Sequence, residues 1–203
     1  YQPRIEKIMT KDAKLRTFIT TDADRNELVS MVYDTTYGVV KPDDTLVVLD
    51  DSIVRGTTLR ESILRILDRL RPKKIVIVSS APEIRYPDCY GIDMSKSKDF
   101  VAFQAAIALV KETGREALLT EIYEKCKASL DIPRDQVVNE VKPLFKLFKP
   151  HEVEKKIAQI LRPADLKADF EVIYQSIEGL HAACPNHKGD WYFSGDYPTP
   201  GGN

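Results

Sequence analysis

Two apolar runs, joined by a glycine-containing loop and an amphipathic stretch, constrain the fold of this chain more than any other feature. Residues 45–49 (TLVVL) and 75–78 (IVIV) are unbroken and β-favouring, a pattern typical of strands buried on both faces of a parallel sheet. Between them, residues 58–70 carry apolar side chains at helical spacing, which predicts an amphipathic helix. Strand, loop, helix and strand within about 35 residues make one βαβ unit. We therefore predict an α/β fold with a mainly parallel sheet and flanking helices.

The rest of the chain adds further strands and a long helical excursion. Before the βαβ unit, the patterns predict a strand at 15–20, a helix at 24–33 and a turn at 41–44. After it we expect roughly three or four helices within 97–128 and 134–162, a strand at 170–174 and a helix at 177–183. The helical excursion should break near Gly114 and at Ile132-Pro133, and the tail from Cys184 should be irregular.

The order of these expected elements predicts that the chain has four parts. They are a core over residues 1–100, a helical insertion over 101–164, the last strand and helix of the core over 165–183, and an irregular C-terminal tail over 184–203.

Composition narrows the classes of partner. The 30 Lys and Arg residues nearly balance the 31 Asp and Glu residues, so no net charge favours nucleic acid or a membrane surface. No stretch reaches the roughly 18 unbroken apolar residues of a membrane helix. The 3 cysteines form no disulfide pattern, which favours a reducing, cytoplasmic setting. Because the chain starts at Tyr1, we expect it to be part of a longer protein.

The loop between the first apolar run and its helix carries the chemistry. It begins with Asp50 and Asp51, hereafter the acid pair, and continues through the cradle segment, which comprises Ser52, Ile53, Val54, Arg55, Gly56, Thr57 and Thr58. In open α/β sheets, ligands bind at the carboxyl ends of the strands, where this loop lies. Main-chain amides at a helix N-terminus favour an anion. A glycine permits backbone conformations that a side chain would forbid and lets a phosphate approach closely, and hydroxyls add donors. The cradle segment is therefore predicted to bind a phosphate.

The acid pair cannot hold the phosphate, because like charges repel. Its expected partners are the hydroxyls of an adjacent ribose and a divalent cation, Mg²⁺, which prefers oxygen ligands. Negative charge beneath a sugar ring also stabilises positive charge that develops at the anomeric carbon. The whole loop, Asp50 to Thr58, is thus predicted to bind a 5-phosphorylated ribose, most naturally phosphoribosyl pyrophosphate. It is neither a Walker loop nor a dinucleotide fingerprint, since it lacks both glycine patterns.

At these residues the sequence resembles the type I phosphoribosyltransferases, and among them the bacterial amidophosphoribosyltransferases. The resemblance lies in VVLDDSIVRGTT (47–58), SSAPEIRYPDCYGID (79–93), RTFI (16–19) and DFEVIYQSIEGLHAA (169–183). It implies a transferase in which glutamine-derived ammonia displaces pyrophosphate from phosphoribosyl pyrophosphate, with Mg²⁺. The product is 5-phosphoribosylamine, and the reaction is the first step of de novo purine biosynthesis. Family members tend to be homo-oligomers, so the resemblance implies one here.

The sequence also departs from the family pattern. The family begins with a glutaminase domain that has no counterpart in these 203 residues, so we expect that domain elsewhere in the same chain and the present piece to be inactive alone. Many relatives carry a basic segment after the RTFI match; here Arg16 and Arg25 are the candidates for contacting the leaving pyrophosphate.

Some family members hold an iron–sulfur cluster with cysteines near the YGID segment and in the tail. Here the corresponding residues are Cys89, Cys184 and His187, a set that suits zinc or, with less ease, an iron–sulfur cluster. We favour the alternative, in which the two cysteines are simply packed residues.

Two other functions share the phosphate loop. A regulatory protein that senses phosphoribosyl pyrophosphate should add a nucleic-acid-binding module, and the charge balance argues against one. A base-salvage phosphoribosyltransferase should lack the 79–93 match. We therefore expect the transferase part of an amidophosphoribosyltransferase.

Overall fold

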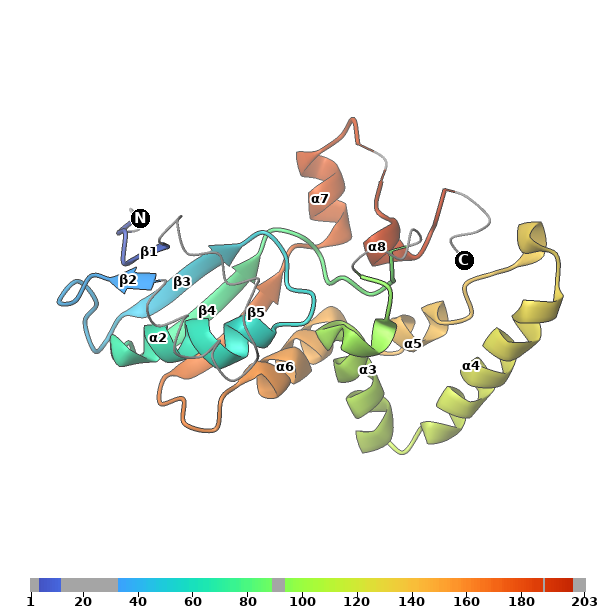
Figure 1. Ribbon diagram of the computed structural model, residues 1–203, viewed down its shortest axis with the longest axis horizontal. Helices are drawn as coiled ribbons and strands as arrows, with labels where there is room; N and C mark the ends of the chain where they lie inside the picture. Colours follow the sequence, from blue (N-terminus) through green and yellow to red (C-terminus); the bar gives the residue numbers. More distant parts are fainter. Residues whose placement is uncertain (1–3, 12–32, 89–93, 188, 199–203) are drawn as a thin grey trace. The chain divides into compact units, whose positions relative to one another are not determined.

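The computed structural model describes residues 4–11, 33–88, 94–187 and 189–198 (Figure 1). The predicted strand at 15–20, most of the predicted helix at 24–33, and the candidates Arg16, Arg25 and Cys89 lie outside these residues. In chain order, the elements are β1 (Met9–Lys11), β2 (Tyr33–Thr35), β3 (Thr45–Asp50), η2 (Leu59–Ile63), α2 (Leu64–Arg69), β4 (Lys74–Ser79), η3 (Ser97–Asp99), α3 (Val101–Glu112), α4 (Glu116–Ala128), η4 (Ser129–Asp131), η5 (Arg134–Gln136), α5 (Lys142–Lys146), α6 (Pro150–Leu161), β5 (Asp169–Tyr174), α7 (Ile177–Ala183) and α8 (Trp191–Ser194).

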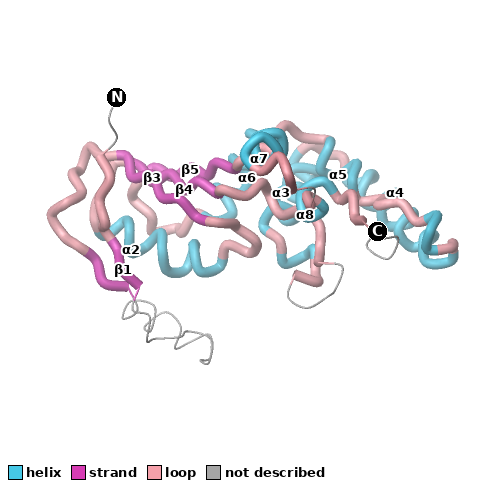
Figure 2. The backbone as a smooth tube through the Cα atoms, turned by 90° about the horizontal axis from the view of Figure 1, so that it is seen from above, coloured by secondary structure: helices cyan, strands magenta, loops and turns pink. Residues whose placement is uncertain are grey.

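The larger sheet has three strands in the order β3-β4-β5, side by side in Figures 1 and 2. The N–H of Lys73 donates to the Asp44 carbonyl at one end, and that of Ser80 donates to the Asp50 carbonyl at the other (2.9 Å each). Because both partners advance along the chain together, β3 and β4 are parallel. The same holds for β4 and β5, where Asp169 N–H donates to Lys73 and Gln175 N–H to Ser79. The predicted α/β fold with a parallel sheet and flanking helices is confirmed.

The chain divides into two compact units. The first unit comprises residues 1–48, 56–76 and 161–171, and the second comprises 49–55, 77–160 and 172–203. In the first unit, Leu64, Leu67 and Ile75 are almost fully buried, at 0–1% exposure, so the helix after the loop covers the start of β4. In the second unit, the core gathers around Phe100, Val101 and Ile157.

Most predicted elements are present. The strands at 75–78 and 170–174 correspond to β4 and β5, and the helix at 177–183 corresponds to α7. The amphipathic helix predicted at 58–70 is also present, as the π-helix η2 followed by α2. The excursion is helical and breaks at Gly114 and before Pro133, as expected. The turn at 41–44 is closed by a hydrogen bond from Asp44 N–H to the Lys41 carbonyl at 3.0 Å.

Three predictions need correction. The run at 45–49 is not buried on both faces, because Val47 and Leu49 of β3 are 59% and 75% exposed. Tyr33 belongs to β2, which pairs antiparallel with β1, and not to a helix. The tail is not wholly irregular, since it contains α8.

None of the helices in the described part of the chain combines the length and the apolar character needed to span a membrane.

Candidate functional site

The acid pair lies where the sequence placed it, at the carboxyl end of β3. Asp50 is the last residue of the strand, and both aspartates are exposed. The Asp51 N–H donates to Asp50 Oδ1 at 3.0 Å, and the Ser52 N–H donates to Asp51 Oδ1 at 2.7 Å. Each carboxylate therefore uses one oxygen to fix the local main chain. The Ser52 contact also occupies one of the amides that the sequence assigned to a phosphate.

The main chain of the acid pair is joined to the loop that follows β4. The N–H of Ser80 donates to the Asp50 carbonyl at 2.9 Å, and the N–H of Ala81 donates to the Asp51 carbonyl at 3.0 Å. The Ser80 hydroxyl adds contacts to the same two carbonyls at 3.1 and 3.3 Å. These contacts extend the parallel pairing beyond the strands, so the acid pair is part of the sheet edge and not a separate surface loop.

The middle of the cradle segment is anchored in the second unit. The Ile53 side chain is buried, with 3% exposed, and the Val54 carbonyl accepts a hydrogen bond from Val101 N–H at the start of α3, at 2.9 Å. The Ile53 side chain is therefore not available to a ligand, and the Val54 carbonyl is already engaged by α3. Arg55 is exposed.

The last part of the cradle segment belongs to the first unit. Gly56 has φ +68°, a left-handed conformation that disfavours any side chain. A Cβ at this position would meet Leu161 Cδ2 at 2.4 Å, so the glycine is needed for protein packing as well as for backbone conformation. From the sequence, the absence of a side chain at Gly56 was expected to make room for a phosphate. In the structure, the space that a side chain would occupy is filled by Leu161.

The two threonines keep their polar groups available. Both are exposed, and the Thr58 side chain makes no capping hydrogen bond to η2. The first helical turn is closed by Arg60 N–H, which donates to the Gly56 carbonyl at 2.9 Å. Two hydroxyls and two amides at a helix start suit an anion.

Burial raises the pKa of one acidic side chain in the acid pair and of one in the loop after β4. Partial desolvation raises the pKa of Asp50 above its ordinary value, and the neighbouring Asp51 charge adds to this shift. Burial likewise raises the pKa of Glu83, which is 4% exposed, although Arg85 donates to its Oε2 from Nε at 2.9 Å and from Nη2 at 2.7 Å. A bound cation would oppose the first effect, because it favours the charged form of Asp50.

The donor chemistry fits Mg²⁺ at the acid pair better than a soft metal elsewhere. Asp50 and Asp51 offer carboxylate oxygens, which suit a hard cation, and each retains an Oδ2 outside the two contacts described above. Cys184 is exposed, at the end of α7, and His187 Nδ1 accepts a hydrogen bond from Gly189 N–H at 3.1 Å. Within the described ranges, no cluster of three or more His, Cys, Asp or Glu side chains is placed to hold a metal ion.

Comparison with known proteins points to one family. The chain is 48% identical over 61 residues to the amidophosphoribosyltransferase of Pasteurella multocida (strain Pm70), covering 30% of this chain and 12% of that protein. It is 45% identical over 60 residues to the Escherichia coli (strain K12) enzyme, with 30% and 12% covered. It is 35% identical over 105 residues to the Bacillus subtilis (strain 168) enzyme, with 51% and 22% covered. The chain is partly homologous to amidophosphoribosyltransferase, in its phosphoribosyltransferase region.

Two solved structures match nearly the whole chain in fold. The glutamine phosphoribosylpyrophosphate amidotransferase from B. subtilis, complexed with ADP and GMP, matches 96% of the chain with a TM-score of 0.52 and 24% identity. A structure described as the allosteric regulatory enzyme of purine biosynthesis also matches 96%, with a TM-score of 0.52 and 25% identity. In both cases the chain spans 32% of the solved protein, which is about a third of its length. No family model matches the sequence.

Sequence reasoning missed the residues that support the site. Ser80 and Ala81 lie within the 79–93 match, but their contact to the acid pair was not predicted, because a main-chain contact depends on strand register and not on side-chain type. The contact of the tail residue Tyr192 was not predicted either; its carbonyl accepts hydrogen bonds from the N–H groups of Arg85 and Tyr86.

Proposed function

We propose that this chain forms the phosphoribosyl pyrophosphate-binding part of an amidophosphoribosyltransferase. The observation that carries the proposal is the position of the loop Asp50 to Thr58 at the carboxyl end of β3, directly before a helix. The partial homology to amidophosphoribosyltransferases supports the same conclusion.

The two parts of the loop divide the ligand between them. The amides and hydroxyls of Thr57 and Thr58, together with the main chain of the remaining cradle segment, bind the 5-phosphate. Asp50 and Asp51 accept hydrogen bonds from the ribose hydroxyls. Their negative charge stabilises the positive charge that develops at the anomeric carbon when the bond to pyrophosphate breaks. The electron pair of that bond leaves with pyrophosphate, the lone pair of ammonia forms the new bond to carbon, and the nitrogen then releases one proton to give the amine.

Asp50 and Asp51 are also the residues that would hold Mg²⁺. When bound, the ion would neutralise part of the charge on the leaving pyrophosphate.

The wider setting follows from the family relationship. We infer that ammonia comes from a glutaminase domain elsewhere in the same polypeptide, that the enzyme is a cytoplasmic homo-oligomer, and that the described piece does not complete the reaction alone. The division into a core over 1–100 and 165–183, a helical insertion over 101–164 and a tail over 184–203 remains our proposal for how the chain is organised. Arg16 and Arg25 remain candidates for contacting pyrophosphate.

Ligand binding by the chain tests this function. Titration calorimetry with phosphoribosyl pyrophosphate, in the presence of Mg²⁺, should give saturable binding, and ribose 5-phosphate should compete. Asp50→Asn combined with Asp51→Asn should weaken binding at least about tenfold, since each charged hydrogen bond contributes roughly 1.5–3 kcal/mol. Asp43→Asn is the matched control, because Asp43 is an exposed aspartate in the turn before β3.

The outcome that contradicts the proposal is a double variant that binds within a factor of two of the unaltered chain. In the complete enzyme, the same pair of substitutions should lower ammonia-dependent pyrophosphate release while leaving glutamine hydrolysis intact.

A further inference from the structure

The tail residues 190–197, hereafter the tail segment, contact one short stretch of the second unit, the Arg85–Asp88 loop. The Tyr192 carbonyl accepts hydrogen bonds from Arg85 N–H at 2.9 Å and from Tyr86 N–H at 3.1 Å. The Tyr192 hydroxyl donates to Asp88 Oδ1 at 3.1 Å, and the Tyr197 hydroxyl donates to the Pro87 carbonyl. Two tail tyrosines therefore bind four consecutive residues that lie more than a hundred positions earlier in the chain.

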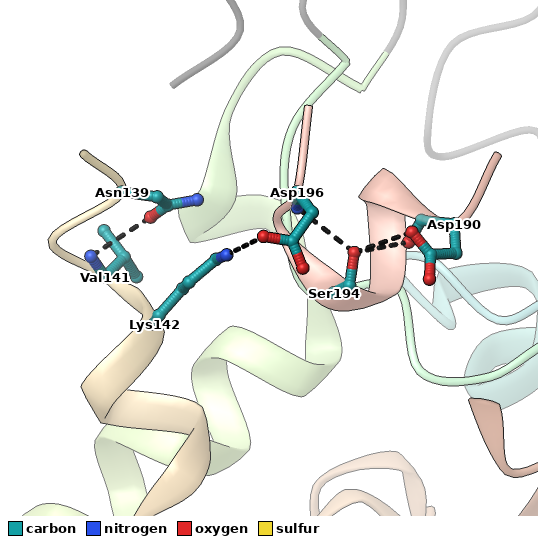
Figure 3. A network of polar contacts seen from close by, with 6 residues as sticks. All are labelled: Asn139, Val141, Lys142, Asp190, Ser194 and Asp196. Carbon is teal, nitrogen blue, oxygen red and sulfur yellow. Dashed lines mark hydrogen bonds and ion pairs between the residues drawn. The ribbon is translucent and has the colours of Figure 1, made fainter. Parts of the chain in front are cut away.

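The tail segment is itself held in shape. Figure 3 shows Ser194 Oγ donating to Asp190 Oδ1, at 2.8 Å, and Asp196 N–H donating to Ser194 Oγ, at 3.1 Å. Lys142, at the start of α5, forms an ion pair with Asp196 in the same view. These contacts fix the tail segment on both sides of α8. The backbone positions of Tyr192 and Tyr197 are therefore held in place.

Gly195 brings the tail segment into close contact with the loop. It has φ +73°, and a Cβ there would lie 2.9 Å from both Tyr86 Cζ and Asn139 Nδ2. The Tyr86 ring is 4% exposed and packs edge-on against Phe145, with ring centroids 5.3 Å apart. The hydrogen bonds of the tail segment are thus backed by a packed aromatic contact.

The Arg85–Asp88 loop is connected to the acid pair by a short, well-fixed stretch. Ser80 and Ala81 hold the carbonyls of Asp50 and Asp51, and the Ser79 hydroxyl donates to the Ala81 carbonyl at 2.7 Å. Glu83 and Ile84, at 4% and 6% exposure, anchor the middle of the stretch, and Arg85 bonds back to Glu83. Residues 82–84 of this stretch are buried, and a packed segment transmits position because its side chains cannot move independently.

We propose that Tyr192 and Tyr197 are positioning residues for the acid pair. They hold the Arg85–Asp88 loop, and the stretch before that loop holds the main chain of Asp50 and Asp51. The proposal rests on the proposed function only for its consequence for ligand binding. The structural coupling itself is independent of what the site binds.

Amide-resolved hydrogen exchange tests the coupling. In a Tyr192→Phe/Tyr197→Phe variant, which keeps both rings and the Tyr192 carbonyl, the amides of Arg85 and Tyr86 should exchange roughly fivefold faster, the factor expected for loss of about one hydrogen bond. The amides of Ser80 and Ala81 should also accelerate, because they bond to the acid pair. Tyr123→Phe is the matched control, since Tyr123 is 63% exposed on α4.

The pattern of exchange decides between a positioning role and a local one. Acceleration confined to Arg85 and Tyr86, or none at all, overturns the proposal. Gly195→Ala provides a second variant that pushes the tail segment away from Tyr86 without removing a hydroxyl, and it should accelerate the same amides.

Calorimetry with phosphoribosyl pyrophosphate and Mg²⁺ separates this inference from the proposed function. If the unaltered chain binds, the tyrosine variant should bind several-fold more weakly, and unchanged binding together with unchanged exchange at Ser80 and Ala81 refutes the positioning role. If the unaltered chain does not bind but exchange at Ser80 and Ala81 accelerates, the proposed ligand is wrong and the positioning role stands.

Discussion

Replacing Gly56 by alanine should destabilise the first unit through two separable effects. The left-handed backbone at φ +68° costs about 1–2 kcal/mol for any residue with a Cβ. The new methyl group would also lie 2.4 Å from Leu161 Cδ2, and Leu161 is only 2% exposed, so its side chain has little room to move. Overpacking of this kind typically costs about 1–3 kcal/mol. We therefore expect Gly56→Ala to lower the free energy of unfolding by roughly 2–5 kcal/mol.

A double-mutant cycle isolates the steric part. Leu161→Ala alone should cost about 2–5 kcal/mol, because it leaves a cavity. In the double variant the clash is absent, so the combined loss should be smaller than the sum of the two single losses by about 1–3 kcal/mol. Urea titration followed by circular dichroism measures all four proteins. Gly114→Ala is the control for the backbone effect, since Gly114 has φ +66° and nothing within 4 Å of the added Cβ.

The cycle has a clear negative result. If Gly56→Ala costs no more than Gly114→Ala, and if its effect adds to that of Leu161→Ala without coupling, then the contact with Leu161 does not explain why a glycine occupies the loop. The absence of a side chain at Gly56 would then have to be explained by the ligand.

Three further predictions follow from other contacts. Asp68→Ala should lower the free energy of unfolding by about 2 kcal/mol, because the Asp68 carboxylate accepts hydrogen bonds from the N–H groups of Lys167 and Ala168; urea titration measures the loss, and Asp68→Asn should lose less. Tyr174→Phe should leave stability unchanged or raise it by about 1 kcal/mol, because the buried Tyr174 hydroxyl has no hydrogen-bond partner among the described residues; a loss above that size would show that the hydroxyl is satisfied. The raised pKa of Asp50 makes a contribution to stability that is fully present below its ordinary pKa of 3.8 and is lost as pH rises through the folded-state pKa. The stability of Asp50→Asn relative to the unaltered chain should therefore increase over that rise, and melting curves recorded from below pH 3.8 upward check the sign.

Local patterns predicted the elements that depend on neighbours in sequence. The unbroken apolar run that forms β4 and the apolar residues at helical spacing that form α2 are examples. The same holds for α7, whose start is further fixed by a hydrogen bond from Gly179 N–H to the Ser176 hydroxyl at 2.9 Å. The acid pair was placed correctly at a strand end for the same reason, since an apolar run followed by two aspartates marks the end of a strand.

Contacts between distant residues were beyond that reasoning. Tyr192 reaches Asp88 across 104 positions, and Asp68 reaches Ala168 across 100. The apolar run at 45–49 does not show how many strands lie next to it in the sheet. It therefore predicted that the run is buried, whereas Val47 and Leu49 are exposed. The role of Gly56 was assigned to conformation correctly, but its neighbour Leu161 follows only from how α6 ends.

The outward face of β3 has a consequence for handling the protein. Among the described residues, β3 ends the strand order of its sheet, and the open residues Val47 and Leu49 alternate along it. An edge strand with exposed apolar side chains can pair with a strand of another molecule. Such pairing leads to self-association at high protein concentration. Val47→Lys should therefore decrease the light scattering of a concentrated sample, because a lysine on an edge strand disfavours pairing with another molecule.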